Sequence, residues 1–143
     1  MGDVPGALAV ASVERTVART TIDELLAAAR ARLARVEVDE VEGALAAGAV
    51  LVDIRGSEQR ERDGAIPHAV VVARNVLEWR VDESSGHALP ELSGDLDRRI
   101  VLVCDEGYQS SLAAATLQDL GFARATDLVG GFTARRAAGM PVD

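Results

Sequence analysis

Lysine is absent from this chain of 143 residues, so all 15 basic side chains are arginines. No lysine is therefore available to form a Schiff base or to contact nucleotide phosphates from a P-loop. The 23 acidic side chains bring the formal net charge to −8. Sequence-independent binding to a nucleic-acid backbone depends on basic residues, so we expect no nucleic-acid partner.

Cysteine is almost absent as well, since Cys104 is the only one in the chain. One thiol can form neither an internal disulfide nor a zinc site of two or more cysteines, and we expect no metal and no other cofactor. The longest apolar stretch, residues 4–13, is too short to span a bilayer and follows no basic segment of the kind that opens a signal peptide. We therefore expect a cytoplasmic protein with no membrane partner and a reduced thiol.

The chain does contain short apolar segments that alternate with helical patterns from residue 36 onward. Four of these segments are apolar on both faces and predict buried strands, at residues 49–53, 70–73, 99–103 and 125–129. The clearest helices are predicted at 110–120 and 132–138. This alternation is typical of an α/β fold with a mainly parallel sheet, in which ligands bind at the carboxyl ends of the strands.

The residues before position 36 divide into two parts. Residues 1–19 show no clear periodicity, and we expect a mobile tail there. Thr21 and Glu24 have the spacing of a capping box, which predicts an amino-terminal helix within residues 20–35. The main domain is then expected to span residues 36–143.

Cys104 directly follows the strand predicted at 99–103 and lies under the amino end of the helix predicted at 110–120. A free thiol is only about 3% ionised at pH 7, but the amide groups of a tight loop and a helix start favour the thiolate. Gly107 allows the loop to turn, and the hydroxyl of Ser110 can cap the helix. The arrangement predicts a nucleophilic thiolate, whereas an isolated cysteine at a strand end would more often be an inert core residue.

Asp105 and Glu106 work against this thiolate because they carry negative charge next to it. A carboxylate about 6 Å away, at an effective dielectric constant near 20, would disfavour the thiolate by up to about 2.8 kcal/mol. We therefore expect both side chains to point outward into water.

The loop Cys104-Asp-Glu-Gly-Tyr-Gln-Ser110 resembles the active-site loop Cys-x-x-Gly-x-Arg-Ser of the rhodanese family of sulfurtransferases. Asp53-Ile-Arg55, followed by Gly64-Ala-Ile-Pro67, resembles the amino-terminal signature of that family. Gly130-Gly-Phe132, followed by Ala138-Gly-Met-Pro141, resembles its carboxy-terminal signature. The resemblance covers about residues 36–143 and implies a five-stranded, mainly parallel sheet with helices on both faces.

The resemblance also implies a mechanism in which Cys104 takes a sulfane sulfur from a donor, holds it as a persulfide and passes it to a nucleophilic acceptor. Donor and acceptor would each be a small molecule or a protein. The substrate-binding residues would be those of the loop after the cysteine, Asp105, Glu106, Gly107, Tyr108, Gln109 and Ser110. Asp53 and Arg55 would lie at the same edge of the sheet and support the neighbouring loops.

The sequence departs from the family pattern at positions that bear on function. Gln109 replaces the arginine of the loop, and Arg135 stands where the last signature usually has tryptophan. Losing the loop arginine removes a charged hydrogen bond worth roughly 1.5–3 kcal/mol, so thiosulfate, a dianion, is expected to be a poor donor. A less charged persulfide donor or a protein with a basic surface fits better, and Arg135 is a candidate replacement for the missing charge.

Two other functions stay open on the sequence. The lost arginine and the acidic loop also fit a catalytically inactive rhodanese-like module that binds other proteins. Phosphatases and arsenate reductases use a cysteine in an amide cradle as well, but their loops contain an arginine for the oxyanion, and the loop after Cys104 has none.

Overall fold

The computed structural model describes residues 18–143, so most of the segment expected to be a mobile tail, residues 1–19, lies outside the described residues. A parallel sheet forms the centre of the fold, with the strand order β2-β1-β3-β4. The strands are β1 (Val50–Asp53), β2 (Val70–Val71), β3 (Ile100–Val103) and β4 (Thr126–Asp127). The register pairs Val52 with both Val70 and Leu102, so the carboxyl ends of β1 and β3 lie side by side.

The predicted α/β architecture with a parallel sheet is confirmed, but within residues 18–143 the sheet has four strands where the resemblance implied five. The position of the fifth strand is occupied by Val36, which forms a single parallel bridge to Leu128. Pairing stops there because the chain turns into a 3-10 helix at Val38–Glu40, only two residues later. Two backbone hydrogen bonds at one residue are too few to define a strand.

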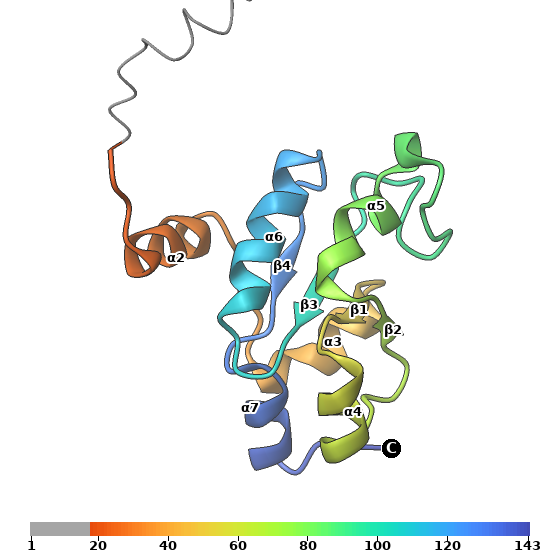
Figure 1. The fold of residues 1–143 in the computed structure, drawn as a ribbon. Helices are drawn as coiled ribbons and strands as arrows, with labels where there is room; N and C mark the ends of the chain where they lie inside the picture. Colours follow the sequence, from red (N-terminus) through yellow and green to blue (C-terminus); the bar gives the residue numbers. More distant parts are fainter. Residues whose placement is uncertain (1–17) are drawn as a thin grey trace, which may run out of the picture.

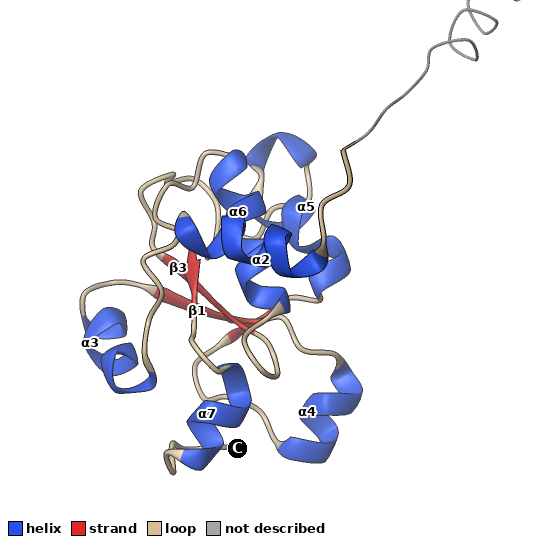
Figure 2. Ribbon diagram, turned by 90° about the vertical axis from the view of Figure 1, so that its left-hand side faces the viewer, coloured by secondary structure: helices blue, strands red, loops and turns tan. Residues whose placement is uncertain are grey.

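Helices cover both faces of the sheet, as Figure 2 shows. Successive residues of a strand point to opposite faces. Ile100 and Leu102 accordingly belong to one apolar cluster, with residues of α5 (Leu77–Val81) and α6 (Gln109–Asp119). Val101 and Val103 belong to a second cluster, with residues of α3 (Val41–Ala46) and α7 (Gly131–Ala137). Helix α4 (Ser57–Asp63), between β1 and β2, contributes to neither cluster and has no buried residue.

The amino-terminal helix, α2 (Ile22–Ala31), lies against α6 (Figure 1). Its capping box forms, since the Thr21 hydroxyl accepts the N–H of Glu24 at 3.1 Å and the Glu24 carboxylate accepts the N–H of Thr21 at 2.8 Å. The latter hydrogen bond holds the pKa of Glu24 below its ordinary value. Arg32 after the helix pairs with Asp119 of α6 at 2.6 Å, so this segment is packed on the rest of the chain.

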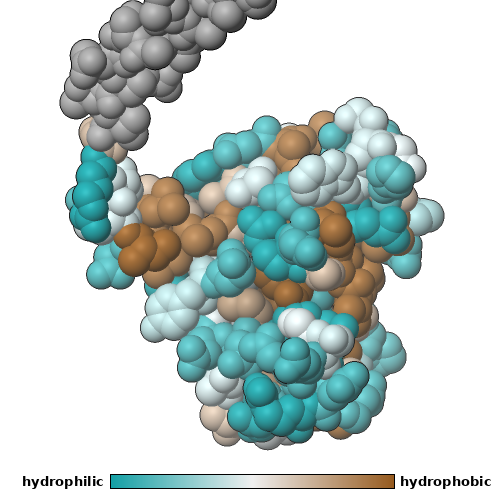
Figure 3. Space-filling model, in the orientation of Figure 1, coloured by the Kyte–Doolittle hydropathy of each residue, from teal (hydrophilic) through white to brown (hydrophobic). Residues whose placement is uncertain are grey.

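Ile22 and Leu25 of α2 are exposed apolar side chains, and Leu25 lines a pocket between α2 and α6. Figure 3 shows hydrophobic surface in the region of α2. No helix within residues 18–143 is long and apolar enough to cross a membrane. In that part of the chain there is also no group of three or more histidine, cysteine and acidic side chains arranged to hold a metal ion.

Candidate active site

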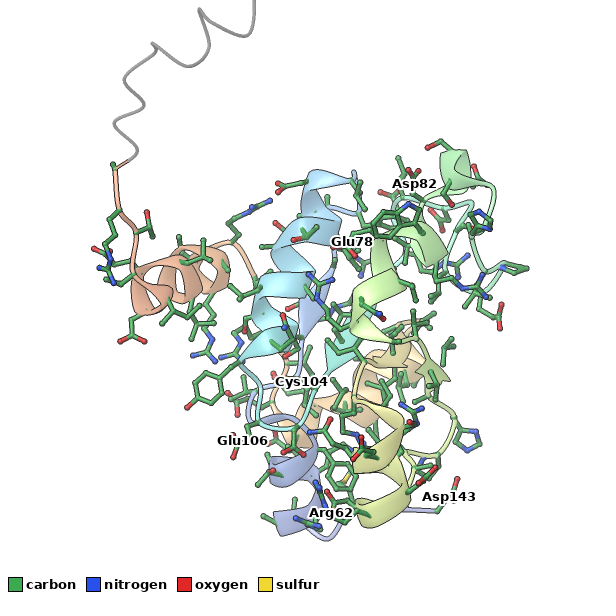
Figure 4. The ribbon with its side chains drawn as sticks, in the orientation of Figure 1. Arg62, Glu78, Asp82, Cys104, Glu106 and Asp143 are labelled. Carbon is green, nitrogen blue, oxygen red and sulfur yellow. The ribbon has the colours of Figure 1, made fainter. Side chains whose placement is uncertain are left out.

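Cys104 lies at the carboxyl end of β3, where the chain leaves the sheet and turns toward α6 (Figure 4). The residue is 7% exposed. Cys104 lines an open pocket of about 230 Å³. The other lining residues come from the end of β1, from α4 and from the loop that follows Cys104. The pocket-lining residues are Ile54, Arg55, Gln59, Cys104, Asp105, Glu106, Tyr108 and Gln109. Cys104 is therefore buried but borders a pocket that is open to solvent.

Residues 104–110, here called the cysteine loop, place two amide groups on the sulfur. The N–H groups of Gly107 and Ser110 donate to the Cys104 sulfur at 3.1 and 3.3 Å. Within the described part of the chain, the N–H groups of Glu106, Tyr108 and Gln109 find no acceptor. The cysteine loop therefore contains three amide donors without an acceptor, in addition to the two that bond the sulfur.

The loop amides face the sulfur because donors from elsewhere in the chain hold the loop carbonyls on the opposite side. The N–H groups of Phe132 and Thr133, in the first turn of α7, donate to the carbonyls of Cys104 and Asp105 at 2.8 and 2.9 Å. Arg30 and Arg35 donate to the carbonyl of Gly107 at 2.7 and 3.1 Å. The C=O and N–H of a trans peptide point in opposite directions, so the N–H of Tyr108 is turned away from these arginines.

Two glycines allow the cysteine loop to approach α7 this closely. Gly107 has φ of +85°, and a Cβ atom there would lie 2.7 Å from the nitrogen of Gly130. Gly131 has φ of +60°, and a Cβ atom there would lie 2.5 Å from the carbonyl oxygen of Cys104. The loop motif and the carboxy-terminal motif found in the sequence thus meet backbone to backbone.

Behind the cysteine loop, Asp127 at the end of β4 collects four hydrogen bonds. The residue is fully buried. Arg35 donates to Oδ1 at 2.8 Å and to Oδ2 at 3.1 Å. The hydroxyls of Ser110 and Ser111 each donate to Oδ2 at 2.7 Å. These four residues, Arg35, Ser110, Ser111 and Asp127, form what we call the rear network.

Asp53 and Arg55 form a buried ion pair at the carboxyl end of β1. The Arg55 guanidinium bonds both carboxylate oxygens of Asp53, the shorter contact being 2.9 Å, and donates to the carbonyl of Gly64 at 2.8 Å. It also lies 3.9 Å from the centre of the Phe132 ring. Its third nitrogen, Nη1, is buried and has no hydrogen-bond partner in residues 18–143. The pair thus connects β1 with the loop before β2 and with α7.

The charge balance of the pocket is negative. Asp105 is half-buried, Glu106 is exposed, and both belong to the pocket lining; Figure 4 shows Glu106 on the outer side of the loop. Gln109, at the position of the family arginine, is exposed and also lines the pocket. Arg55 is the basic residue of the lining, and its charge is already paired with Asp53.

Arg135 does not replace the missing charge of the loop. Its side chain is buried away from the pocket lining and donates to the carbonyl of Pro141 at 3.2 Å. Burial, and in second place the nearby charge of Arg55, lowers the pKa of Arg135. Tyr108, by contrast, is 59% exposed at the pocket, and the Arg30 guanidinium lies 5.3 Å from the centre of its ring.

The rhodanese-like domain model matches residues 37–138. The chain belongs to the rhodanese-like domain family. The family predicted from the three sequence motifs is therefore confirmed, and a sulfurtransferase among its relatives supports the same general class. A thiosulfate sulfurtransferase, GlpE, of Stutzerimonas stutzeri (strain A1501) is 34% identical over 88 residues, which make up 60% of this chain and 69% of that protein.

Solved structures of rhodanese-like proteins have the same fold. The human single-domain sulfurtransferase matches with a TM-score of 0.61 and 22% identity, covering 72% of this chain and 95% of that one. A protein of unknown function from Rhodopseudomonas palustris CGA009, called "Possible Tyrosine Phosphatase", matches with a TM-score of 0.79 and 32% identity. That match covers 92% of this chain and all of the other, so it extends beyond the rhodanese-like domain into the amino-terminal segment.

The sequence motifs pointed to the cysteine loop and to the Asp53–Arg55 pair. The pocket lining contains some of these residues, namely Arg55, Cys104, Asp105, Glu106, Tyr108 and Gln109, but not Asp53, Gly107 or Ser110. The analysis of the sequence missed Asp127, Arg30 and Arg35. One signal was available for Asp127, because it ends a strand at the same edge of the sheet as Asp53. Nothing local pointed to the two arginines, which reach the cysteine loop from a segment more than 70 residues away.

Proposed function

We propose that this rhodanese-like domain is a sulfurtransferase that carries sulfane sulfur as a persulfide on Cys104. The observation that supports the proposal best is the set of amides in the cysteine loop, two bonded to the sulfur and three more without an acceptor within residues 18–143. Amide donors of this kind stabilise a thiolate and the negative outer sulfur of a persulfide in the same way. The pocket gives a donor access to this sulfur.

The reaction consists of two displacements at sulfur. In the first, the Cys104 thiolate attacks the outer sulfur of a donor R–S–S⁻, forms a new S–S bond and releases the donor as the thiolate R–S⁻. In the second, a nucleophilic acceptor attacks the outer sulfur on Cys104 and takes it, and the Cys104 thiolate leaves with the electron pair of the broken bond. The amides of residues 106–110 bind the outer sulfur between the two steps.

The charge of the pocket favours a donor with little negative charge. Thiosulfate would bring two negative charges to a site where Asp105 and Glu106 already carry two and Gln109 supplies none of the opposite sign. We therefore infer that thiosulfate is a poor donor, and that a singly charged persulfide or a protein with a basic surface is a better one.

Mass spectrometry of the intact protein tests the proposal. The purified chain is exposed in turn to an alkyl persulfide and to thiosulfate, and the gain of one sulfur atom is followed with time. We expect the alkyl persulfide to load Cys104 faster than thiosulfate, and the Cys104→Ser variant to gain no sulfur. If neither donor loads the wild-type protein, the carrier function is wrong.

The name of the Rhodopseudomonas palustris relative makes phosphatase activity a second reaction to measure. A phosphoryl dianion would meet Asp105, Glu106 and Gln109 at this pocket. We expect no turnover of an aryl phosphate for that reason. If the domain instead binds other proteins without catalysing a reaction, the Cys104→Ser variant should keep the cellular role of the protein.

A further inference from the structure

The hydroxyl group of Ser110 lies between two groups that compete for its proton. Its oxygen is 3.3 Å from the sulfur of Cys104 and 2.7 Å from Oδ2 of Asp127. Both neighbours are buried, and so is Ser110. A serine hydroxyl has one proton to donate and lone pairs with which to accept, and the proton rotates to suit its surroundings.

The short contact with a carboxylate takes the proton, since a charge-assisted O–H···O bond is among the strong hydrogen bonds of proteins. The hydroxyl then turns its lone pairs to the sulfur, where it accepts the S–H of the thiol. If Cys104 were a thiolate, its negative charge would face the lone pairs of the Ser110 oxygen, and this contact would be repulsive. In this state, Ser110 favours the thiol form of Cys104, against the two amides that favour the thiolate.

Asp127 does not depend on Ser110 for its hydrogen bonds. Its Oδ2 atom also accepts from Ser111 at 2.7 Å and from Arg35 at 3.1 Å, and its Oδ1 atom accepts from Arg35 at 2.8 Å. The carboxylate therefore keeps three donors when Ser110 turns away. The movement involves one hydroxyl rotation and no displacement of heavy atoms.

We propose that Asp127 is a positioning residue that controls the ionisation of Cys104 through the hydroxyl of Ser110. With Cys104 as a thiol, the hydroxyl donates to Asp127. When the thiol loses its proton to solvent, the hydroxyl rotates and donates to the sulfur instead. The strength with which Asp127 retains the hydroxyl thus sets how readily the thiolate forms.

Other charged groups lie on the elements around the pocket, among them Arg62 of α4, which lies near Asp105. Arg55 lies on the side of β1 and is paired with Asp53. Asp105 and Glu106 lie on the cysteine loop itself. Arg30 from α2 and Arg35 from the segment after it contact the carbonyl of Gly107, and Arg135 of α7 lies near Arg55. A substitution that alters only the summed charge changes the ionisation whether or not the Ser110 hydroxyl is present, and this separates the two effects.

The proposal deepens the proposed function, but its test does not require sulfur transfer. The rate of alkylation by iodoacetamide is measured against pH, and its midpoint reports the ionisation of Cys104. Four proteins are compared: the wild type, Asp127→Asn, Ser110→Ala and the double variant. The amide of the Asp127→Asn variant can donate to the Ser110 oxygen, which frees the hydroxyl proton for the sulfur. We expect the midpoint to fall by about one pH unit or more when Ser110 is present.

In the Ser110→Ala background, the same Asp127→Asn substitution is expected to move the midpoint by less than half of that amount. An equal shift in both backgrounds would show that Asp127 acts through its charge alone and would overturn the proposal. A failure to load sulfur together with the expected pH shifts would leave the proposal standing and refute only the carrier function.

Ser111→Ala gives a second test that does not depend on a change at Asp127. Ser111 donates to the same oxygen of Asp127 and accepts from Arg30 Nε at 3.1 Å, but within residues 18–143 it makes no hydrogen bond to the sulfur. Its loss leaves that carboxylate more dependent on Ser110, so we expect the midpoint to rise, opposite to the effect of Asp127→Asn. Far-ultraviolet circular dichroism confirms that each variant is folded. A midpoint that falls or stays unchanged in a folded Ser111→Ala protein contradicts the proposal.

Discussion

Replacing Arg35 by leucine removes three hydrogen bonds from the region behind the cysteine loop. Two of them reach Asp127, at 2.8 and 3.1 Å, and the third reaches the carbonyl of Gly107 at 3.1 Å. Asp127 is fully buried, whereas the side chain of Arg35 is 17% exposed. The substitution therefore leaves a buried carboxylate without its counter-charge.

Breaking a buried ion pair from one side reduces stability by about 3–5 kcal/mol. Ser110 and Ser111 continue to donate to Asp127, so we expect the lower end of this range, about 3 kcal/mol. At a slope of about 1–3 kcal/mol per molar urea, the unfolding midpoint would fall by roughly 1–3 M. Urea unfolding followed by circular dichroism measures this change.

Arg32→Leu is the matched control, because Arg32 belongs to the same segment and also forms an ion pair. Its partner is Asp119, and the two side chains are 42% and 68% exposed. An exposed pair of this kind contributes less than about 1 kcal/mol. Similar losses in the two variants, or a loss below about 1 kcal/mol for Arg35→Leu, would refute the assignment of Arg35 and Asp127 as a buried, stabilising pair.

Three further predictions concern the pocket, the loop and α2. Gln109→Arg restores the charged hydrogen bond of the family loop. In steady-state assays it is expected to raise kcat/KM for thiosulfate about 10-fold or more, mainly through a lower KM. An unchanged KM would show that anion binding is not the limiting defect. Gly131→Ala forces a Cβ atom against the carbonyl of Cys104, so it is expected to lower the melting temperature and slow the alkylation of Cys104. Gly43→Ala is the control: a Cβ there meets no other atom within 4 Å and the residue lies in helix α3, so the melting temperature should not fall and alkylation should not slow. The hydrogen bond from the Thr21 N–H holds the pKa of Glu24 below 4.5, so its contribution to α2 is present above that pH and is lost as the pH falls through the lowered value. Amide exchange of α2 in the wild type and in Glu24→Gln should therefore differ at pH 6 and converge in more acidic solution, and a difference that grows on acidification would reverse the assigned sign.

Much of the fold could be predicted because its signals are local. The apolar run before Cys104 predicted β3, and the helical pattern of residues 110–120 predicted α6, because each signal lies within its own element. The strand count was wrong for a reason of tertiary structure. Val36 does pair with Leu128, but the turn into Val38–Glu40 ends the pairing, and the resemblance to five-stranded relatives carried no information about that turn.

The contacts of the candidate site also fall into those that are close in sequence, which could be predicted, and those that are distant in sequence, which could not. Gly107 and Ser110 lie within six residues of Cys104, so the sequence alone could predict that their amides are near the sulfur. Asp127 is 17 residues from Ser110, and Arg35 is 92 residues from Asp127. Contacts over such separations follow from the order of the strands and from the packing of α2 on α6, which no local pattern records.

The carbonyls of the cysteine loop are held by α7 on one side and by arginines from the amino-terminal segment on the other. A chain that has formed β3 and α6 but has not yet docked these two distant pieces lacks the forces that aim the amides inward. Its cysteine would then behave like the thiol of an unstructured peptide. On the proposed function, activation of the thiol thus requires both distant pieces to be docked, and a partly unfolded molecule that lacks them would not expose an activated nucleophile.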